Sequence, residues 1–261
     1  MEQHLINLGS SLIIREEERE KISISIETIK ERVKQWFGDE IIAIETFGSY
    51  SRNTILPRRV DKDSDIDIMI VFKNEKNYQP QTLLNKLREF VERKYSTSEI
   101  YQSNPTIVLE LGHIKFELVP AIIEDYYGKI YKIPAKASYY LNWMNTSPNK
   151  FKGDLELYNG FTSYLLKPLI RIMKYWNVLN DKVYSSYELE GTILRLASVG
   201  KKPLLDHVQQ IVSGLPVYEL STSKAVKVQK LKSQMDELSK KLRENNKKEA
   251  KEILLSIFPE L

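Results

Sequence analysis

The order of hydrophobic patterns along the chain is the feature that most limits its fold. Short apolar runs typical of strands occur only in its first half, at residues 41–47, 66–72, 106–111 and 114–119. Helical periodicity dominates after residue 154, at 161–178, 187–197, 203–212 and 223–245. Strands mixed with helices, followed by helices alone, predict an α+β fold with a mixed sheet lobe packed against a helical C-terminal lobe.

Two helices are also expected within the first half. Residues 15–37 carry an apolar stripe with spacings of 4, 3, 4 and 3, formed by Ile22, Ile26, Ile29, Val33 and Trp36. The alternation at 22–26 leaves a strand as the alternative, but the flanking charges favour the long helix. Residues 82–94 form a second amphipathic pattern. We therefore expect a sheet lobe at 1–145, braced by the long N-terminal helix, and a helical lobe at 146–261.

Composition excludes several kinds of site. The 261 residues are 42% hydrophobic and 28% charged, which is ordinary for a globular protein. With no cysteine, the chain has no disulfide, thiolate metal centre or cysteine nucleophile, and its three histidines lie far apart in the sequence. Any metal must then be held by oxygen ligands, as Mg²⁺ or Mn²⁺ is. We see neither an apolar run of about 20 residues nor a signal peptide, so a cytoplasmic protein without membrane contact is expected.

The net charge of +4 is concentrated in one segment. Residues 224–251 hold ten basic and four acidic residues, and the rest of the chain holds 29 basic and 31 acidic. We interpret the basic segment as the solvated face of a helix. The rest of the chain is nearly neutral, which favours small substrates over a long nucleic acid, because binding of a long nucleic acid needs a broad basic surface. A long nucleic acid stays open as the alternative.

Two aspartates at the start of a strand indicate a site. In Asp65-Ile66-Asp67-Ile68 the two carboxylates share one strand face, and the isoleucines share the other. Carboxylates placed in this way repel each other unless a cation lies between them. They suit a divalent metal that carries triphosphate oxygens. A charged strand end without a function is the alternative.

Two further elements can join these aspartates. Gly48-Ser49 follows a strand, where glycine lets the backbone approach a phosphate and serine adds a hydroxyl, although an ordinary turn is the alternative. Glu117 lies in an apolar strand on the face that also carries Lys115. A carboxylate there is costly without a partner. It either completes a carboxylate triad or pairs with a neighbouring lysine.

This series of motifs resembles the DNA polymerase-beta-type nucleotidyltransferase superfamily. Within it, the chain is most similar to the bacterial cyclic-oligonucleotide synthases of anti-phage systems (CD-NTases, with the SMODS domain), which are relatives of cyclic GMP-AMP synthase and oligoadenylate synthase. The finer match lies in three segments, Leu118-Val119-Pro120-Ala121, LLKPLIRIMKYWN at 165–177 and SSYELE at 185–190. The resemblance thus covers residues 45–190 in the expected order.

The resemblance implies an activity and a set of residues. Asp65, Asp67 and Glu117 would be catalytic and hold two Mg²⁺ or Mn²⁺ ions, in a catalytic lobe closed over the nucleotide by the helical lobe. The nucleotide-binding residues would be Gly48, Ser49, Lys174, Ser186 and Tyr187, with Lys174 and Ser186 on the phosphates and Tyr187 stacked on the base. Nucleoside triphosphates such as ATP would be joined without a template into a cyclic di- or oligonucleotide, which a downstream effector reads.

One residue departs from this family pattern. The third acid is usually aspartate, whereas this chain has Glu117, whose carboxylate lies about an ångström further out. Two other functions therefore stay open: tailing of RNA or tRNA or modification of a small molecule by the same fold, and a catalytically silent nucleotide-binding module. On the helix at 165–177, Lys167, Arg171 and Lys174 form a basic stripe that faces either a triphosphate or solvent.

Overall fold

The computed structural model describes residues 1–103, 105–125, 127, 130–135 and 142–261. These residues cluster into two compact units. The sheet unit comprises residues 14–58 and 63–153, and the helical unit comprises 1–13, 59–62 and 154–261. The division expected at residues 145 and 146 stays a prediction.

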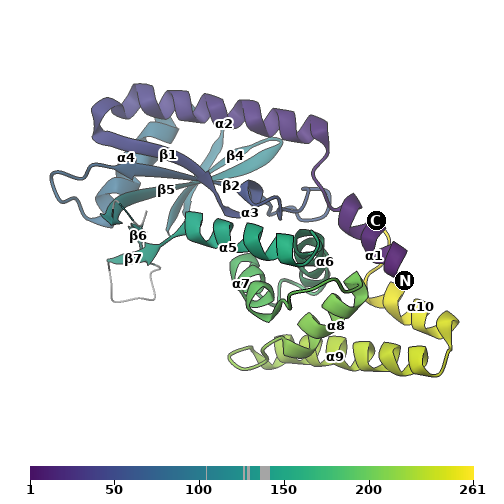
Figure 1. Ribbon diagram of the computed structural model, residues 1–261. Coiled ribbons are helices and arrows are strands. Elements are labelled where there is room, and N and C mark those ends of the chain that lie inside the picture. The colour runs from purple at the N-terminus through teal and green to yellow at the C-terminus, as the bar shows by residue number, and fades with distance from the viewer. Residues whose placement is uncertain (104, 126, 128–129, 136–141) are drawn as a thin grey trace. The chain divides into compact units, whose positions relative to one another are not determined.

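The sheet unit is built on a mixed seven-stranded sheet (Figure 1). Its strands are β1 Ile41–Phe47, β2 Asp65–Phe72, β3 Glu99–Ser103, β4 Thr106–Leu111, β5 Ile114–Asp125, β6 Ile130–Pro134 and β7 Trp143–Thr146. The order is β1-β2-β5-β4-β3, and β6 pairs with both β5 and β7. Only β2 and β5 among these pairs run parallel. The mixed sheet and the four strands expected from the sequence are confirmed.

Two helices cover one face of this sheet, α2 Glu16–Phe37 and α4 Pro80–Lys94 (Figure 1). Apolar side chains of both helices pack with Ile66, Ile68 and Ile70 of β2 in one large core. Trp36 was expected on the buried stripe of α2, and this is wrong, because Phe37 is buried and Trp36 is 37% exposed. At 100° per residue, Trp36 and Phe37 lie about equally far from the centre of the stripe, so helix periodicity does not distinguish them. Phe37 is the one that packs against Phe72 of β2, with ring centroids 5.1 Å apart.

The opposite sheet face is only partly apolar. Met69 and Val71 of β2, Ala121 of β5 and Tyr131 of β6 form a small buried cluster there. Asp65 and Asp67 lie on this same face, because they alternate with the isoleucines of the large core. The first residues of β2 are therefore free of the helices that cover the other face.

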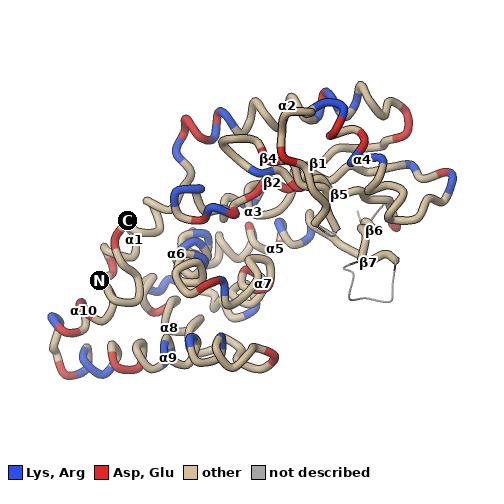
Figure 2. Tube along the Cα trace, turned by 180° about the vertical axis from the view of Figure 1, so that it is seen from behind, with Lys and Arg blue, Asp and Glu red and all other residues tan. Residues whose placement is uncertain are grey.

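The helical unit contains α1 Glu2–Ser11, α6 Leu166–Leu179, α7 Ser186–Leu196, α8 Leu204–Gly214, α9 Thr222–Arg243, α10 Lys247–Ile257 and the end of α5 Pro148–Phe161. The single helix expected at 161–178 is wrong, because Ser163 and Tyr164 adopt positive φ and interrupt it. Figure 2 shows Lys and Arg spread along α9, which holds most of the basic segment at residues 224–251. Among the described residues, none of the helices combines the length and apolarity that crossing a membrane requires.

Candidate active site

The parallel pairing of β2 with β5 brings the three predicted acidic residues together. Asp67 lies directly opposite Glu117, and Asp65 lies directly opposite Lys115. Opposite residues on neighbouring strands point to the same side of a sheet, so all four side chains share the face opposite to α2 and α4. The acids remain accessible, with side-chain exposures of 30% for Asp65 and 22% for Glu117. The side chains predicted from separate segments therefore meet on one accessible surface.

Lys115 lies between two of these carboxylates. Its Nζ is 3.7 Å from Oδ2 of Asp65 and 3.5 Å from Oε1 of Glu117, and its side chain is only 14% exposed. A neighbouring lysine was one of the two partners expected for Glu117, and this contact is confirmed. The second contact, with Asp65, was missed, because it depends on which strand pairs with β5.

The carboxylates gathered around Lys115 repel one another and shift the pKa values of Glu117 and Lys115. Burial raises the pKa of Glu117, the nearby Asp65 carboxylate raises it further, and Lys115 opposes both effects. The pKa of Lys115 is in turn raised, because the attraction of Asp65 and Glu117 outweighs the effect of its own burial. If all four groups are charged, the cluster carries a net charge of −2. Such a cluster favours the binding of a cation.

Gly48 fixes the position of Asp67 from the neighbouring strand end. It has φ +71° and begins the four-residue helix α3 Gly48–Ser51, immediately after Phe47, which pairs with Asp67. A Cβ at Gly48 would lie 1.7 Å from Oδ2 of Asp67. The glycine backbone thus packs directly against this carboxylate, and no other residue type fits there without displacing it.

Ser49 follows in α3, where its carbonyl oxygen accepts hydrogen bonds from the backbone N–H groups of Thr54 and Ile55. These bonds close the loop after β1 into a compact turn. Ser49 is therefore held one residue away from the contact between Gly48 and Asp67. Its predicted contact with a phosphate stays a prediction.

The chemistry of the donor set fits a hard divalent cation. Three carboxylates on one accessible face supply the oxygen ligands that Mg²⁺ and Mn²⁺ prefer. As the side chains of the described residues stand, however, no three His, Cys, Asp or Glu form a group that could hold a metal ion. The Lys115 ammonium lies between two of the candidate ligands instead. Asp65, Asp67 and Glu117 could hold such an ion only after a rearrangement of side chains.

The other predicted nucleotide-binding residues belong to the helical unit. Lys174 of α6 is buried, and its Nζ donates a hydrogen bond of 3.1 Å to Oε1 of the fully buried Glu190 on α7. Ser186 is the first residue of α7, and Tyr187, which follows it, is 66% exposed. Ser185 and Glu188 form a capping box at this helix start. The structure thus shows a local role for the SSYELE segment, and the nucleotide contacts stay predictions.

The basic stripe predicted on α6 is not a solvated face. Arg171 and Lys174 are buried rather than solvated, and only Lys167 is partly exposed. Arg171 donates a hydrogen bond from Nε to the carbonyl oxygen of Gly9 at 3.0 Å. These cations are therefore part of the interior of the helical unit, where their partners come from α1 and α7.

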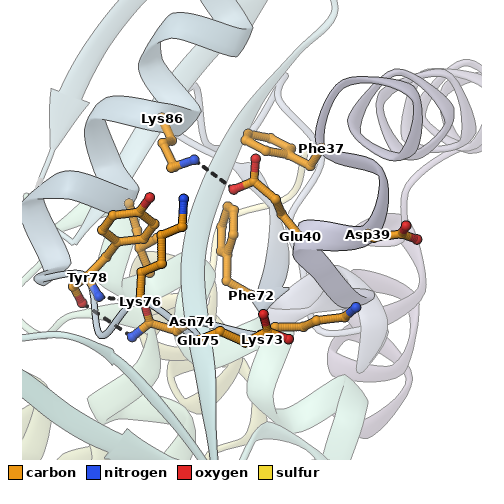
Figure 3. Close-up of a pocket in the computed structure, with 11 residues that line it drawn as sticks. Phe37, Asp39, Glu40, Phe72, Lys73, Asn74, Glu75, Lys76, Tyr78 and Lys86 are labelled. Carbon is orange, nitrogen blue, oxygen red and sulfur yellow. Dashed lines mark hydrogen bonds and ion pairs between the residues drawn. The ribbon is translucent and has the colours of Figure 1, made fainter.

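The sheet unit has a cavity of about 360 Å³, shown in Figure 3, and none of the three predicted acids Asp65, Asp67 and Glu117 lines it. It opens at the far end of β2, beside Phe72, about seven residues or roughly 23 Å along the strand from Asp65. Its lining holds equal numbers of lysines and acidic residues, and Lys86 donates to Glu40 at 2.7 Å. This balance gives the cavity no preference for phosphate, so we place the candidate site at the acids.

Comparisons with known proteins agree with the motifs. The model of the SMODS family, the Second Messenger Oligonucleotide or Dinucleotide Synthetase domain, matches residues 1–159. A probable cyclic nucleotide synthase of Bacillus cereus strain VD146 is 32% identical over 197 residues. That match spans 62% of this chain and 56% of the relative, so the chain covers little more than half of that protein.

Solved structures share the fold over nearly the whole chain. The Bradyrhizobium diazoefficiens CD-NTase CdnG, solved in complex with GTP, has a TM-score of 0.73 at 13% identity, covering 97% of this chain and 94% of CdnG. A deletion mutant of the Vibrio cholerae di-nucleotide cyclase DncV has a TM-score of 0.74 at 14% identity, covering 95% and 91%. At such identities the likeness shows the fold alone. Because the family model matches more than half of the sequence, the chain belongs to the SMODS family, as its motifs indicated.

Proposed function

We propose that this protein is a nucleotidyltransferase that joins nucleoside triphosphates, without a template, into a cyclic di- or oligonucleotide and releases pyrophosphate. The observation that carries the proposal is the register of β2 and β5, which sets Asp67 opposite Glu117 beside the contact between Gly48 and Asp67. Membership of the SMODS family supports the class of product, and the GTP bound to CdnG supports a triphosphate substrate.

In this proposal the carboxylates of Asp65 and Asp67 hold the divalent cation that accompanies the triphosphate, and Glu117 joins them at a second ion. Bound Mg²⁺ or Mn²⁺ would supply Lewis-acid activation of the attacking ribose hydroxyl and would offset phosphate charge. Gly48 keeps the carboxylate of Asp67 in place by direct packing. Ser49 would hydrogen-bond to the phosphates from the compact turn after β1.

Three residues of the helical unit complete the proposal. Lys174 and Ser186 would contact the triphosphate, and the exposed ring of Tyr187 would stack on the base, an interaction worth about 1–3 kcal/mol. We further propose that the product is a signal in cytoplasmic anti-phage defence and is read by a separate effector protein. The similarity of the chain to cyclic nucleotide synthases is the support for this role.

The test is incubation of the purified chain with the four ribonucleoside triphosphates and Mg²⁺ or Mn²⁺. Pyrophosphate release is measured, and the products are identified by mass spectrometry. Asp67→Asn should abolish turnover and leave the fold intact. Asp39→Asn, an exposed carboxylate at the other end of the sheet unit, is the matched control and should keep the activity of the parent.

Other outcomes would replace the proposal. If only added RNA is extended, the protein is a tailing enzyme of the same fold. If triphosphate binds but no pyrophosphate is released with either metal, the protein is a silent nucleotide-binding module. Turnover by Asp67→Asn close to that of the parent would refute the assignment of the site.

A further inference from the structure

Lys115 places an ammonium group among the carboxylates of the candidate site. Its ion-pair partners are the two carboxylates of Asp65 and Glu117, at 3.7 and 3.5 Å from its Nζ. Asp65 is its direct neighbour across the β2–β5 pair, and Glu117 lies two residues further along its own strand. This position is therefore set by the backbone register of two central strands and does not depend on a mobile loop.

The environment of Lys115 shows why a positive charge is needed there. Three carboxylates, of Asp65, Asp67 and Glu117, gather on one face of the two strands. On the neighbouring strand β4, Glu110 lies opposite Lys115 in the strand register. The carboxylate of Glu110 forms an ion pair with Arg58 at 3.8 Å. Removing the Lys115 charge would thus leave Asp65 and Glu117 repelling each other on a partly desolvated surface.

We propose that Lys115 is an internal counter-cation, which holds Asp65 and Glu117 in position in the cation-free protein and competes with a divalent cation for the same two carboxylates. This inference rests on the proposed function, because it assigns these carboxylates as cation ligands. Lys115 is a positioning residue: it acts on the site through Asp65 and Glu117. A divalent cation binds fully only when the ammonium leaves its place between them.

The competition has a measurable consequence for cation affinity. One unit charge less than 4 Å from two ligand carboxylates opposes a divalent cation strongly, even in a surface-like dielectric. Replacing Lys115 by methionine keeps most of the side-chain volume and removes the charge. We expect Lys115→Met to bind Mn²⁺ at least about tenfold more tightly than the parent, since tenfold corresponds to only about 1.4 kcal/mol.

The experiment is calorimetric titration of Mn²⁺ into the full chain without nucleotide, together with thermal unfolding with and without Mn²⁺. Without Mn²⁺, Lys115→Met should unfold at a lower temperature than the parent. In saturating Mn²⁺, its unfolding temperature should rise to that of the parent. Lys115→Arg keeps the charge and should retain the parent's weaker affinity. Lys132→Met is the matched control, because Lys132 lies on the same sheet and pairs with Glu124 at 2.6 Å.

Several results would overturn the inference. Equal or weaker Mn²⁺ affinity in Lys115→Met, including no binding by either chain, contradicts the competition. A stability deficit that persists in saturating Mn²⁺ assigns Lys115 a purely structural role. If Lys115→Met does not fold alone, Lys115→Gln is used, and variants that fail to fold even with Mn²⁺ also overturn the inference.

The same samples separate this inference from the proposed function. Tighter Mn²⁺ binding by the variant, with no turnover of triphosphates by the parent, supports the role of Lys115 and refutes the enzyme. Turnover by the parent, with unchanged Mn²⁺ affinity in the variant, supports the enzyme and refutes the role of Lys115.

Discussion

Replacing Gly48 by alanine tests whether the backbone of β1 and α3 positions Asp67. A Cβ at this residue would lie 1.7 Å from Oδ2 of Asp67 and 2.6 Å from its Cγ. Ordinary van der Waals contact begins at 3.4 Å, so the oxygen must move by about 1.7 Å or the chain must shift. A displacement of about 1 Å at a reacting centre can cost about a hundredfold in rate. We expect Gly48→Ala to lose at least about a hundredfold in turnover.

The substitution also affects stability. Gly48 has φ +71°, a conformation that costs a non-glycine residue about 1–2 kcal/mol. We therefore expect a loss of at least that free energy of unfolding, measured by chemical denaturation. A loss of this size leaves most of a domain of ordinary stability folded, so it does not by itself explain a hundredfold loss of turnover.

A second glycine separates strain from displacement. Gly38 follows α2 with φ +50°, and a Cβ there would meet no atom within 4 Å. Gly38→Ala should therefore lose stability to backbone strain alone and keep turnover close to the parent's. Turnover is measured as pyrophosphate release at saturating triphosphate and Mg²⁺. If Gly48→Ala stays within about threefold of the parent, or if both variants lose the same activity, the packing argument for Asp67 is refuted.

Three further substitutions test other parts of the molecule. Glu117→Asp should at least preserve turnover, because the family pattern usually has aspartate there; its complete loss, measured as kcat, would show that the strand geometry depends on the longer side chain. His207→Leu should weaken the fall in stability between pH 7.5 and 5.5. Burial lowers the pKa of the folded imidazole, so the unfolded chain binds the extra proton and the parent loses stability as pH falls through about 6.5. An equal fall in the stability of both proteins would contradict this. Lys174→Met should destabilise the helical unit by about 3–5 kcal/mol in denaturant titrations, because it removes the ammonium of Lys174 from the buried Glu190 carboxylate. Adding Glu190→Leu should recover part of that loss.

The inner strands could be predicted from the sequence, whereas only one of the outer strands could. β2, β4 and β5 are rich in buried apolar residues, and this is why their patterns are clear. β1 ends the strand order and has no fully buried residue, but five of its seven residues are apolar, so its run could still be recognised. β3 alternates exposed and partly buried residues, and most of its side chains are polar or charged. β6 pairs with β5, and β7 pairs with β6. These pairings depend on distant segments, so the local sequence pattern does not predict the two strands.

The candidate site could be predicted as a set of acids but not as a balance of charges. Alternation along β2 was enough to place Asp65 and Asp67 on one face. The position of Lys115 relative to Asp65 depends on the parallel register of β2 with β5, which joins segments about 50 residues apart. Packing at Gly48 likewise needs the pairing of Phe47 with Asp67, although a glycine after a strand was a usable signal.

The Lys–Glu contacts of two proposed site residues, Lys115 with Glu117 and Lys174 with Glu190, differ in what they permit. Lys115 is partly exposed and shared between two carboxylates, so a cation from solvent can take its place. Lys174 and Glu190 are both buried, and separating them would break a charge pair in the interior, which is strongly destabilising. An ammonium carries three N–H donors, so Lys174 can bind a phosphate only by adding it to the contact with Glu190. We therefore expect exchange with a solvent cation at Lys115, and we expect any contact of Lys174 with a nucleotide to preserve its buried pair with Glu190.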